Sequence, residues 1–265
     1  MNVDFGRTAQ DYAQHRLGFP PRLFDELAKR GIGQAGQRVL DLGTGTGSLA
    51  RGFAERGCEV IAIDPSNDLL RAAGKLAEAA GLKIDFREAT AERTGLDTDC
   101  VDVISAGQCW HWFQRERAAK ECVRILRPGG KIVIAHFDWI PVAGNVAAET
   151  EALILKHNPD WSYAGGTGLY PQWLVDLVQA GFRDLETFSF DVDTQYTHQA
   201  WRGRVRASAG VAASLNSDQV ASFDREHAAL LTRKFPEDPL HIPHRVWCLV
   251  GTLPLAKPGE SPSDA

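Results

Sequence analysis

Residues 38–47, RVLDLGTGTG, constrain the fold of this chain more than any other segment. The apolar run Arg38–Leu42 predicts a short buried strand, and glycines follow it at positions 43, 45 and 47. A helix is predicted next, over Ser48–Arg56, so that backbone N–H groups at its start can meet a ligand. A strand, a glycine-rich turn and a helix in this order are typical of nucleotide-binding α/β proteins.

The residues after this turn continue as an alternation of apolar strands and helices. The predicted strands are Glu59–Asp64, Ile84–Glu88, Val101–Ala106 and Lys131–His136; the predicted helices are Asn67–Ala80 and Arg115–Leu126, and residues 127–130 form a tight turn. Continuous apolar strands joined through helices of about 10–15 residues predict a mostly parallel sheet covered on both faces. We therefore expect a doubly wound α/β domain.

Beyond Phe137 the alternation breaks, and the remaining elements are more widely spaced. We expect a helix at Gln172–Ala180, a strand at Asp184–Val192, two helices within 197–235 and a last strand at Trp247–Leu253. The glycine-rich run 165–168 has no preceding strand and no P-loop lysine, which favours a hinge over a phosphate cradle.

The chain is accordingly divided into five segments. They are 1–36, an N-terminal flap and helix; 37–138, a Rossmann-like ligand-binding core; 139–245, a substrate cap with an interspersed core helix and strand; 246–256, the final core strand; and 257–265, a disordered tail.

Composition excludes several classes of function. A net charge of −5 argues against nucleic acid as the main partner, and no apolar run approaches the length of a membrane span. The five cysteines are odd in number and form no C-x-x-C pair, so we expect reduced thiols in a cytoplasmic protein. We expect the protein to be a monomer or homodimer. Cys109 is expected to be a small buried residue and not a nucleophile.

Two ligands compete for the glycine turn. Gly45–Ala50 fits the dinucleotide pattern G-x-G-x-x-A, and Asp64 lies near the distance expected for a ribose-binding acid. Asp41, however, would stand near the pyrophosphate, where two like charges ~4 Å apart repel by about 4 kcal/mol at an effective dielectric constant of 20. S-adenosylmethionine has an ammonium group, a sulfonium and no phosphate, so the acid suits it, directly or through water. An NAD(P)-dependent oxidoreductase stays open as the alternative.

Five segments carry a more specific resemblance. They are VLDLGTGTG (39–47), IAIDPS (61–66), ATAE (89–92), VISAGQCWHWF (103–113) and ILRPGGKIVI (125–134). Through them the chain resembles the class I S-adenosylmethionine-dependent methyltransferases, of the methyltransferase type 11-like kind that modifies small molecules. The resemblance covers about residues 5–137. It implies a seven-stranded sheet with an antiparallel last strand, helices on both faces and a mainly helical cap.

The resemblance also implies a set of cofactor-binding residues. Asp41, Gly43, Gly45 and Gly47 would meet the methionine end of S-adenosylmethionine, with Gln108 near the sulfonium. Asp64 and Ser66 would lie at the ribose, and Thr90, Ala91 and Glu92 along the adenine. Tyr12 and Arg16 would lie over the cofactor.

Methyl transfer from a sulfonium is an in-line displacement, for which the protein chiefly aligns the reacting atoms. No metal is required, and the sequence has no cluster with metal-ligand spacing. His111, just after the fourth strand, is the candidate general base, although a packing role competes with this interpretation. His136 and Asp138 are secondary candidates. A non-catalytic, S-adenosylmethionine-binding regulatory protein is a further alternative.

The acceptor is expected to be a small molecule bound among aromatic side chains. Trp112, Trp139, Trp173 and Trp201 are the candidates for this substrate pocket. The arginines at 202, 204 and 206 could pair with an acceptor carboxylate, but helical geometry spreads them around the helix, which favours water-facing positions for most of them.

Overall fold

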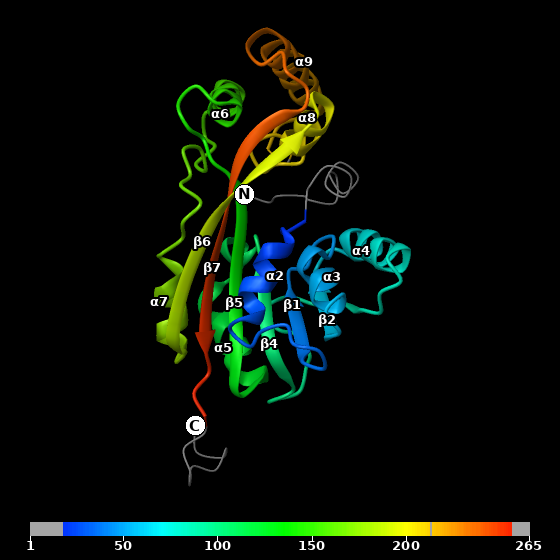
Figure 1. The fold of residues 1–265 in the computed structure, drawn as a ribbon, viewed down its shortest axis with the longest axis vertical. Coiled ribbons are helices and arrows are strands. Elements are labelled where there is room, and N and C mark those ends of the chain that lie inside the picture. Colours follow the sequence, from blue (N-terminus) through cyan, green and yellow to red (C-terminus); the bar gives the residue numbers. More distant parts are fainter. Residues whose placement is uncertain (1–17, 213, 256–265) are drawn as a thin grey trace. The chain divides into compact units, whose positions relative to one another are not determined.

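The computed structural model describes residues 18–212 and 214–255 (Figure 1). Tyr12, Arg16 and the predicted tail lie outside the described residues. Seven strands form one sheet in the order β3-β2-β1-β4-β5-β7-β6, six of them parallel and the last, β7, antiparallel. The strands are β1 Arg38–Leu42, β2 Glu59–Asp64, β3 Asp85–Glu88, β4 Val101–Gly107, β5 Leu126–Trp139, β6 Arg183–Tyr196 and β7 Leu240–Thr252. The predicted fold class is confirmed.

The strand order reverses at β1, which places a ligand site at one end of the sheet. From β1 the chain moves to β2 and β3 on one side and returns to β4 and β5 on the other. Asp41 of β1 lies in register with Ala62 of β2 and with Ser105 of β4. In parallel α/β sheets, ligands bind beyond the carboxyl ends of the strands at such a reversal.

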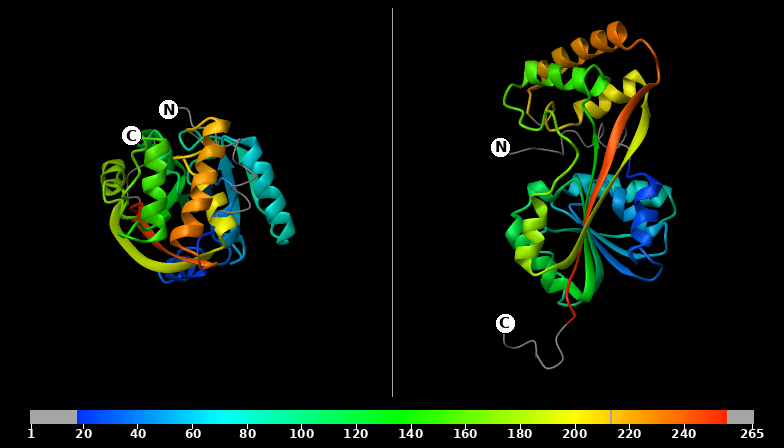
Figure 2. Two further views of the ribbon diagram at one scale, coloured as in Figure 1. Left: turned by 90° about the horizontal axis from the view of Figure 1, so that it is seen from above. Right: turned by 60° about the vertical axis from the view of Figure 1, so that its left-hand side comes forward.

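Helices cover both faces of the sheet (Figure 2). On one face lie α2 Pro21–Ala28, α3 Ser48–Ala54 and α4 Asn67–Ala79, and on the other lie α5 Arg115–Ile125 and α7 Trp173–Ala180. The helix α2 packs closely on α3 because Gly52 has no side chain; a Cβ there would lie 2.0 Å from the ring of Phe24. The strands β1, β2 and β4 are consequently buried over most of their length, as continuous apolar runs require, whereas the edge strand β3 is mostly exposed.

The chain divides into two compact units. The sheet unit comprises Phe19–Ala135, Tyr170–Phe188 and the residues from Cys248 onward, and the helical unit comprises His136–Leu169 and Ser189–Trp247. Strands β5, β6 and β7 contribute residues to both units. The helical unit contains α6 Val146–His157, α8 His198–Arg206 and α9 Ser217–Lys234, and α9 packs against both other helices.

Three parts of the sequence-based assignment are corrected. The helix α6 begins at an Asn145 side-chain cap within a stretch for which no individual helix or strand was predicted. The predicted tight turn at 127–130 is an irregularity inside β5, where Leu126 pairs with Val101 and Lys131 with Val103. The last strand, β7, begins at Leu240, seven residues earlier than predicted from the apolar run that starts at Trp247. The continuation of β5 and the early start of β7 arise from pairing with strands that are distant in the sequence, whereas the start of α6 is set by its own side-chain cap.

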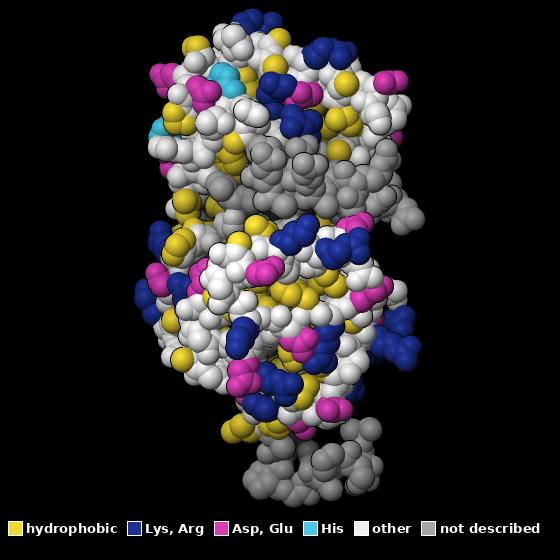
Figure 3. Space-filling view, turned by 90° about the vertical axis from the view of Figure 1, so that its right-hand side faces the viewer, with side chains coloured by type: hydrophobic (Ala, Val, Ile, Leu, Met, Phe, Trp, Pro, Cys, Tyr) yellow, Lys and Arg dark blue, Asp and Glu magenta, His cyan; other side chains and the backbone are white. Residues whose placement is uncertain are grey.

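The surface charges, the cysteines and the lengths of the helices were also compared with the expectations from composition. Basic and acidic side chains are interspersed over the face shown in Figure 3. All five cysteines are free thiols. Within the described ranges, no helix is long and apolar enough to cross a membrane.

Candidate functional site

The glycine turn between β1 and α3 requires glycine for two reasons. Gly43, Gly45 and Gly47 have φ values of +56°, +56° and +79°, a region that side chains disfavour. A Cβ on Gly43 would also lie 3.1 Å from atoms of Cys109 and Phe113. The turn therefore exposes backbone where a ligand can approach closely.

Asp41 lies beneath this turn and is 2% exposed. Its Oδ2 accepts a hydrogen bond from the Thr44 hydroxyl at 2.6 Å, and its Oδ1 accepts one from the Ser105 hydroxyl at 2.7 Å. Burial raises the pKa of Asp41 to about 6, and the nearby charge of Asp64 adds to this rise. Both carboxylate oxygens are thus engaged within the protein, and the geometry makes Asp41 an anchor for the turn.

Asp64 ends β2 and is 6% exposed. Its Oδ2 accepts the backbone N–H of Gly45, and its Oδ1 accepts the backbone N–H of Ser66, both at 2.9 Å. Burial raises the pKa of this carboxyl as well, while the two N–H donors act in the opposite direction. The Ser66 hydroxyl caps α4 by accepting from the N–H of Leu69 at 3.4 Å. Asp64 is therefore held in one orientation between the glycine turn and the start of α4.

Three residues around the turn were missed by sequence reasoning. Thr44 and Ser105 hold Asp41, and Arg51 donates from Nη1 to the Thr46 carbonyl at 2.5 Å. Burial lowers the pKa of Arg51. Ser105 carried a signal: it is a hydroxyl residue in an apolar strand, and parallel pairing brings it level with Asp41.

The segment Thr90–Glu92 follows β3 and is only partly open. Ala91 is buried, and Thr90 forms an isolated bridge with Arg93. The Glu92 carboxylate accepts the backbone N–H of Gln114 at 2.8 Å, so it holds the residue before α5. Contact with a ligand along this segment would consequently come from its backbone.

Gln108 stands just beyond the carboxyl end of β4 with strained backbone. Its φ is +59°, which is uncommon for a residue other than glycine. Its N–H donates to the carbonyl of Ala135 at 2.8 Å, and this bond fixes the turn. Backbone strain of this kind concentrates at functional sites.

His111 lies in a short 3₁₀ helix, η2 Trp110–Trp112, that follows this turn. Its ring stacks on Trp173 with centroids 6.4 Å apart, and Trp173 stacks on Tyr170 at 4.3 Å. The buried indole of Trp110 donates to Asp176 of α7 at 2.9 Å. These contacts give His111 a packing role within the sheet unit.

The remaining candidates fall into two groups. Trp112, 41% exposed, and the buried Trp173 belong to the sheet unit, whereas Trp139 and Trp201 lie together in the helical unit with ring centroids 5.2 Å apart. His136 and Asp138, also of the helical unit, contact each other at 3.3 Å. Among the described residues, no group of three or more His, Cys, Asp or Glu side chains could hold a metal ion.

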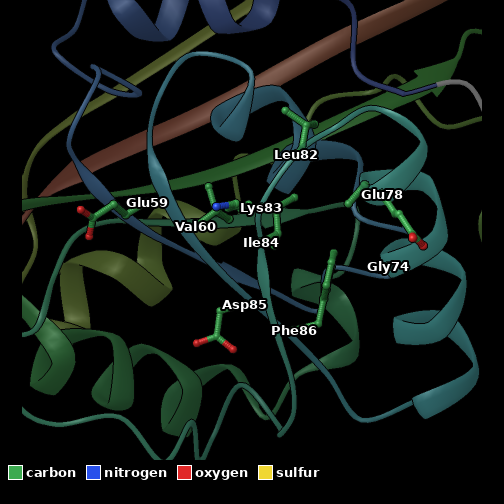
Figure 4. Close-up of a pocket in the computed structure, with 10 residues that line it drawn as sticks. Glu59, Val60, Gly74, Glu78, Leu82, Lys83, Ile84, Asp85 and Phe86 are labelled. Carbon is green, nitrogen blue, oxygen red and sulfur yellow. The ribbon is translucent and has the colours of Figure 1, made fainter.

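A hollow of about 660 Å³ lies at the opposite ends of β2 and β3 from Asp64 (Figure 4). Glu59 and Asp85, the first residues of these strands, line it together with Phe86 and the second half of α4. Its position at the amino ends of the strands separates it from the glycine turn.

Comparison with known proteins identifies the family. The profile of the methyltransferase domain matches residues 40–134. A Mycobacterium tuberculosis protein named an uncharacterized methyltransferase is 33% identical over 200 residues, covering 67% of this chain and 76% of the relative. The demethylmenaquinone methyltransferase of Thermus thermophilus is 37% identical over 107 residues, covering 39% of this chain and 49% of the relative.

A solved structure supports the same fold. It is that of a candidate type II methyltransferase from Anaeromyxobacter dehalogenans, 24% identical, with a TM-score of 0.64 and with 91% of this chain and 99% of that chain covered. This chain belongs to the class I S-adenosylmethionine-dependent methyltransferases.

Proposed function

We propose that this protein is an enzyme that transfers a methyl group from S-adenosylmethionine to a small-molecule acceptor by in-line displacement. The observation that carries the proposal is the pair Asp41 and Asp64, two buried carboxyls at the ends of neighbouring strands on either side of a glycine turn. A positively charged nucleoside ligand complements this arrangement, and membership of the family points to the same ligand.

The charge of the site argues against a dinucleotide. A pyrophosphate at the turn would bring negative charge toward Asp64 and the more deeply buried Asp41, whose raised pKa already reflects the cost of holding charge there. An ammonium or sulfonium would instead favour the ionised carboxylates. We therefore treat an NAD(P)-dependent oxidoreductase as the second candidate function, after a methyltransferase.

We assign the roles of the sheet-unit residues on this basis. Asp64 would accept hydrogen bonds from the ribose hydroxyls, because its oxygens retain lone pairs beyond those used by Gly45 and Ser66. The turn residues would contact the methionine portion. The backbone of Thr90 and Ala91 would line the adenine, and Gln108 would lie near the sulfonium. Tyr12 and Arg16 remain predictions for residues outside the described part of the chain.

When bound, S-adenosylmethionine supplies an electrophilic methyl group. The chain's part is to hold donor and acceptor in line, and orientation of this kind can lower a barrier by ~7–11 kcal/mol. For an acceptor that loses a proton, His111 is the candidate base in the sheet unit, with His136 and Asp138 as second choices. Residues 37–138 are proposed to bind the cofactor and residues 139–245 the acceptor.

One relative and the net charge of the chain support a small-molecule acceptor. The Thermus thermophilus relative is named for demethylmenaquinone, a small molecule, and its similarity covers 39% of this chain. The acidic net charge of −5 also disfavours nucleic acid as an acceptor.

Release of S-adenosylhomocysteine tests the proposal directly. The full chain is incubated with S-adenosylmethionine and pools of phenols, carboxylic acids, amines and thiols, and S-adenosylhomocysteine is quantified by mass spectrometry. We expect one chemical class to raise product release well above the rate without acceptor. Tight cofactor binding without product from any pool would instead support the non-catalytic alternative.

A further inference from the structure

A carboxylate of α7 holds the indole of Trp110 in η2, the short helix that follows β4. The Asp176 Oδ2 atom accepts the indole N–H at 2.9 Å, and Trp110 is fully buried. The same carboxylate oxygen lies 3.2 Å from Nε of Arg115, the first residue of α5. Because a buried N–H without an acceptor is costly, the bond to Asp176 determines where the Trp110 side chain can lie.

A second contact of α7 reaches the next residue of η2. Trp173 and Asp176 stand three residues apart in α7, a spacing that places both on one face of the helix. The Trp173 ring stacks on the His111 ring with 8° between their planes, and α7 also packs along α5 (Figure 1). The helix α7 therefore holds η2 at two consecutive residues, Trp110 and His111.

The residues that flank η2 lie against the glycine turn. Cys109 precedes η2 and Phe113 follows it, and a Cβ on Gly43 would lie 3.1 Å from atoms of both. The Cys109 thiol donates to the Leu42 carbonyl at 3.2 Å. The Phe113 ring meets the Trp110 ring edge to face, with centroids 5.8 Å apart. Contacts thus run from α7 through Trp110 and Phe113 to Gly43.

We propose that Asp176 is a positioning residue of the cofactor site. By holding Trp110, it keeps Cys109 and Phe113 close against Gly43, in the part of the turn that would contact the methionine portion of S-adenosylmethionine. Asp176 acts through these residues and not on the reacting atoms. This inference rests on the proposed function, and it adds a residue outside the matched methyltransferase domain, residues 40–134.

Gly43 benefits from this packing because a glycine backbone samples many conformations. Its φ of +56° lies in a region that glycine enters and leaves readily. Carboxylates anchor the turn at Thr44 and at Gly45, whereas Cys109 and Phe113 add the restraint at Gly43. A looser Gly43 would lower the affinity for the ligand portion that it contacts, because the turn would have to be ordered on binding.

Asp102 provides a matched control in the same unit. Its carboxylate also accepts one N–H, the backbone N–H of Arg38 at 2.8 Å, and one guanidinium, that of Arg127 at 2.6 Å. Asp102 stands near the amino end of β4, at the opposite end of the sheet from the glycine turn. Asp102→Leu should therefore destabilise the sheet unit, as Asp176→Leu does, without changing the turn.

Calorimetric titration of the full chain and its variants with S-adenosylhomocysteine and with 5′-methylthioadenosine tests the inference. The second ligand shares the adenosine and the sulfur of the first but lacks its amino acid portion. We expect Asp176→Leu to lower the affinity for S-adenosylhomocysteine ~10-fold and that for 5′-methylthioadenosine less than ~2-fold. Asp176→Asn keeps an oxygen that can accept the indole N–H, so it should retain most of the affinity for S-adenosylhomocysteine.

Two further measurements separate positioning from general destabilisation. Trp110→Phe removes the donor of the same hydrogen bond, so it should cause the same selective loss, and adding Asp176→Leu to it should lower the affinity little further. Hydrogen exchange of the peptide that spans residues 40–48, measured without ligand, should be faster in Asp176→Leu and unchanged in Asp102→Leu. If Asp176→Leu does not fold, Trp110→Phe takes its place in both measurements.

Several results would overturn the inference. They are an equal loss of affinity for the two ligands in Asp176→Leu, an equally large loss in Asp102→Leu, and additive losses in the double variant. Unchanged hydrogen exchange over residues 40–48 in Asp176→Leu would also reject it, whether or not 5′-methylthioadenosine binds. These outcomes leave the proposed function standing, whereas failure of the unaltered chain to bind S-adenosylhomocysteine would reject the proposed function itself.

Discussion

The Thr44 hydroxyl donates to the Asp41 carboxylate at 2.6 Å and so ties the glycine turn to the strand that precedes it. Asp41 is buried, and its other oxygen is taken by Ser105. We expect the carboxylate to act on a ligand through the backbone that it holds in place. From the sequence we expected Asp41 to suit the ligand directly or through water, and its hydrogen bonds within the protein add a role in holding the turn.

Thr44→Val tests this anchoring role. Valine keeps the shape of the side chain but removes the donor, leaving one oxygen of a buried carboxylate unpaired. We expect the free energy of unfolding to fall by about 1.5–3 kcal/mol and the affinity for S-adenosylhomocysteine to fall on the order of tenfold. Urea denaturation and calorimetric titration measure the two effects.

Thr232→Val provides the control for that substitution. The Thr232 hydroxyl is exposed and donates to the Ala228 carbonyl within α9. Its loss should change both quantities by little. An unchanged affinity in Thr44→Val would show that the turn does not depend on Asp41.

The stability of the helical unit should depend on pH through two buried histidines. Burial lowers the pKa of His227 and of His244 from 6.5 to about 4. In the unfolded chain both return to about 6.5, so between pH 6.5 and 4 the unfolded state binds more protons. The two neutral histidines contribute to the free energy of unfolding, and this contribution is fully present above pH 6.5. It is lost as the pH falls to 4, by up to roughly 3 kcal/mol for each residue.

The difference in the free energy of unfolding between the unaltered chain and His227→Phe isolates the effect of His227. Asp41 acts in the opposite direction, because its raised pKa makes the folded state bind more protons between pH 6 and 3.8. Subtracting the unfolding free energies at each pH cancels Asp41. We expect the unaltered chain to lose stability relative to the variant between pH 7 and 5. A constant difference over this range would mean that His227 is not held neutral by burial.

Glu121 of α5 should stabilise the sheet unit more than its neighbours on the same helix do. Its carboxylate accepts from Arg124 and from both the hydroxyl and the N–H of Thr94, and these bonds lower the pKa of Glu121 to about 2. Glu121→Ala leaves those donors unpaired and should lower the free energy of unfolding by about 1–3 kcal/mol.

Glu116→Ala is the matched control on the same helix. Glu116 pairs with Lys120 at the surface, where solvent screens the pair, so its removal should change the free energy of unfolding little. Chemical denaturation at pH 7 compares the two variants. Equal losses would indicate that the Thr94 contacts add nothing to stability.

The sequence predicted the sheet and the glycine turn well because both depend on local patterns. Continuous apolar runs and an acid at each strand end place β1 and β2 at the predicted bounds. The helix α6 was missed because its capping residue, Asn145, stands among tryptophan, proline and glycine residues that resemble a loop. The first half of β7 was missed because it is rich in histidine and is buried only by the helical unit.

The residues of the candidate site could largely be predicted from the sequence, but their hydrogen-bond partners could not. Asp64 follows from an acid at the end of a strand, but its bonds to Gly45 and Ser66 depend on how two loops meet. The pairing of Arg202 and Arg206 with Asp224 could also not be read from the sequence, because it depends on how α9 packs against α8. Tertiary contacts of this kind leave no periodic signal.

Binding of S-adenosylmethionine and of NAD to the unaltered chain and to Asp64→Ala, measured by calorimetric titration, tests the central claim most directly. We predict that the unaltered chain binds S-adenosylmethionine and not NAD, and that Asp64→Ala folds but has no measurable affinity for S-adenosylmethionine. Binding of NAD alone would contradict the proposed function. An affinity of Asp64→Ala for S-adenosylmethionine within a few-fold of the unaltered chain would contradict the ribose assignment.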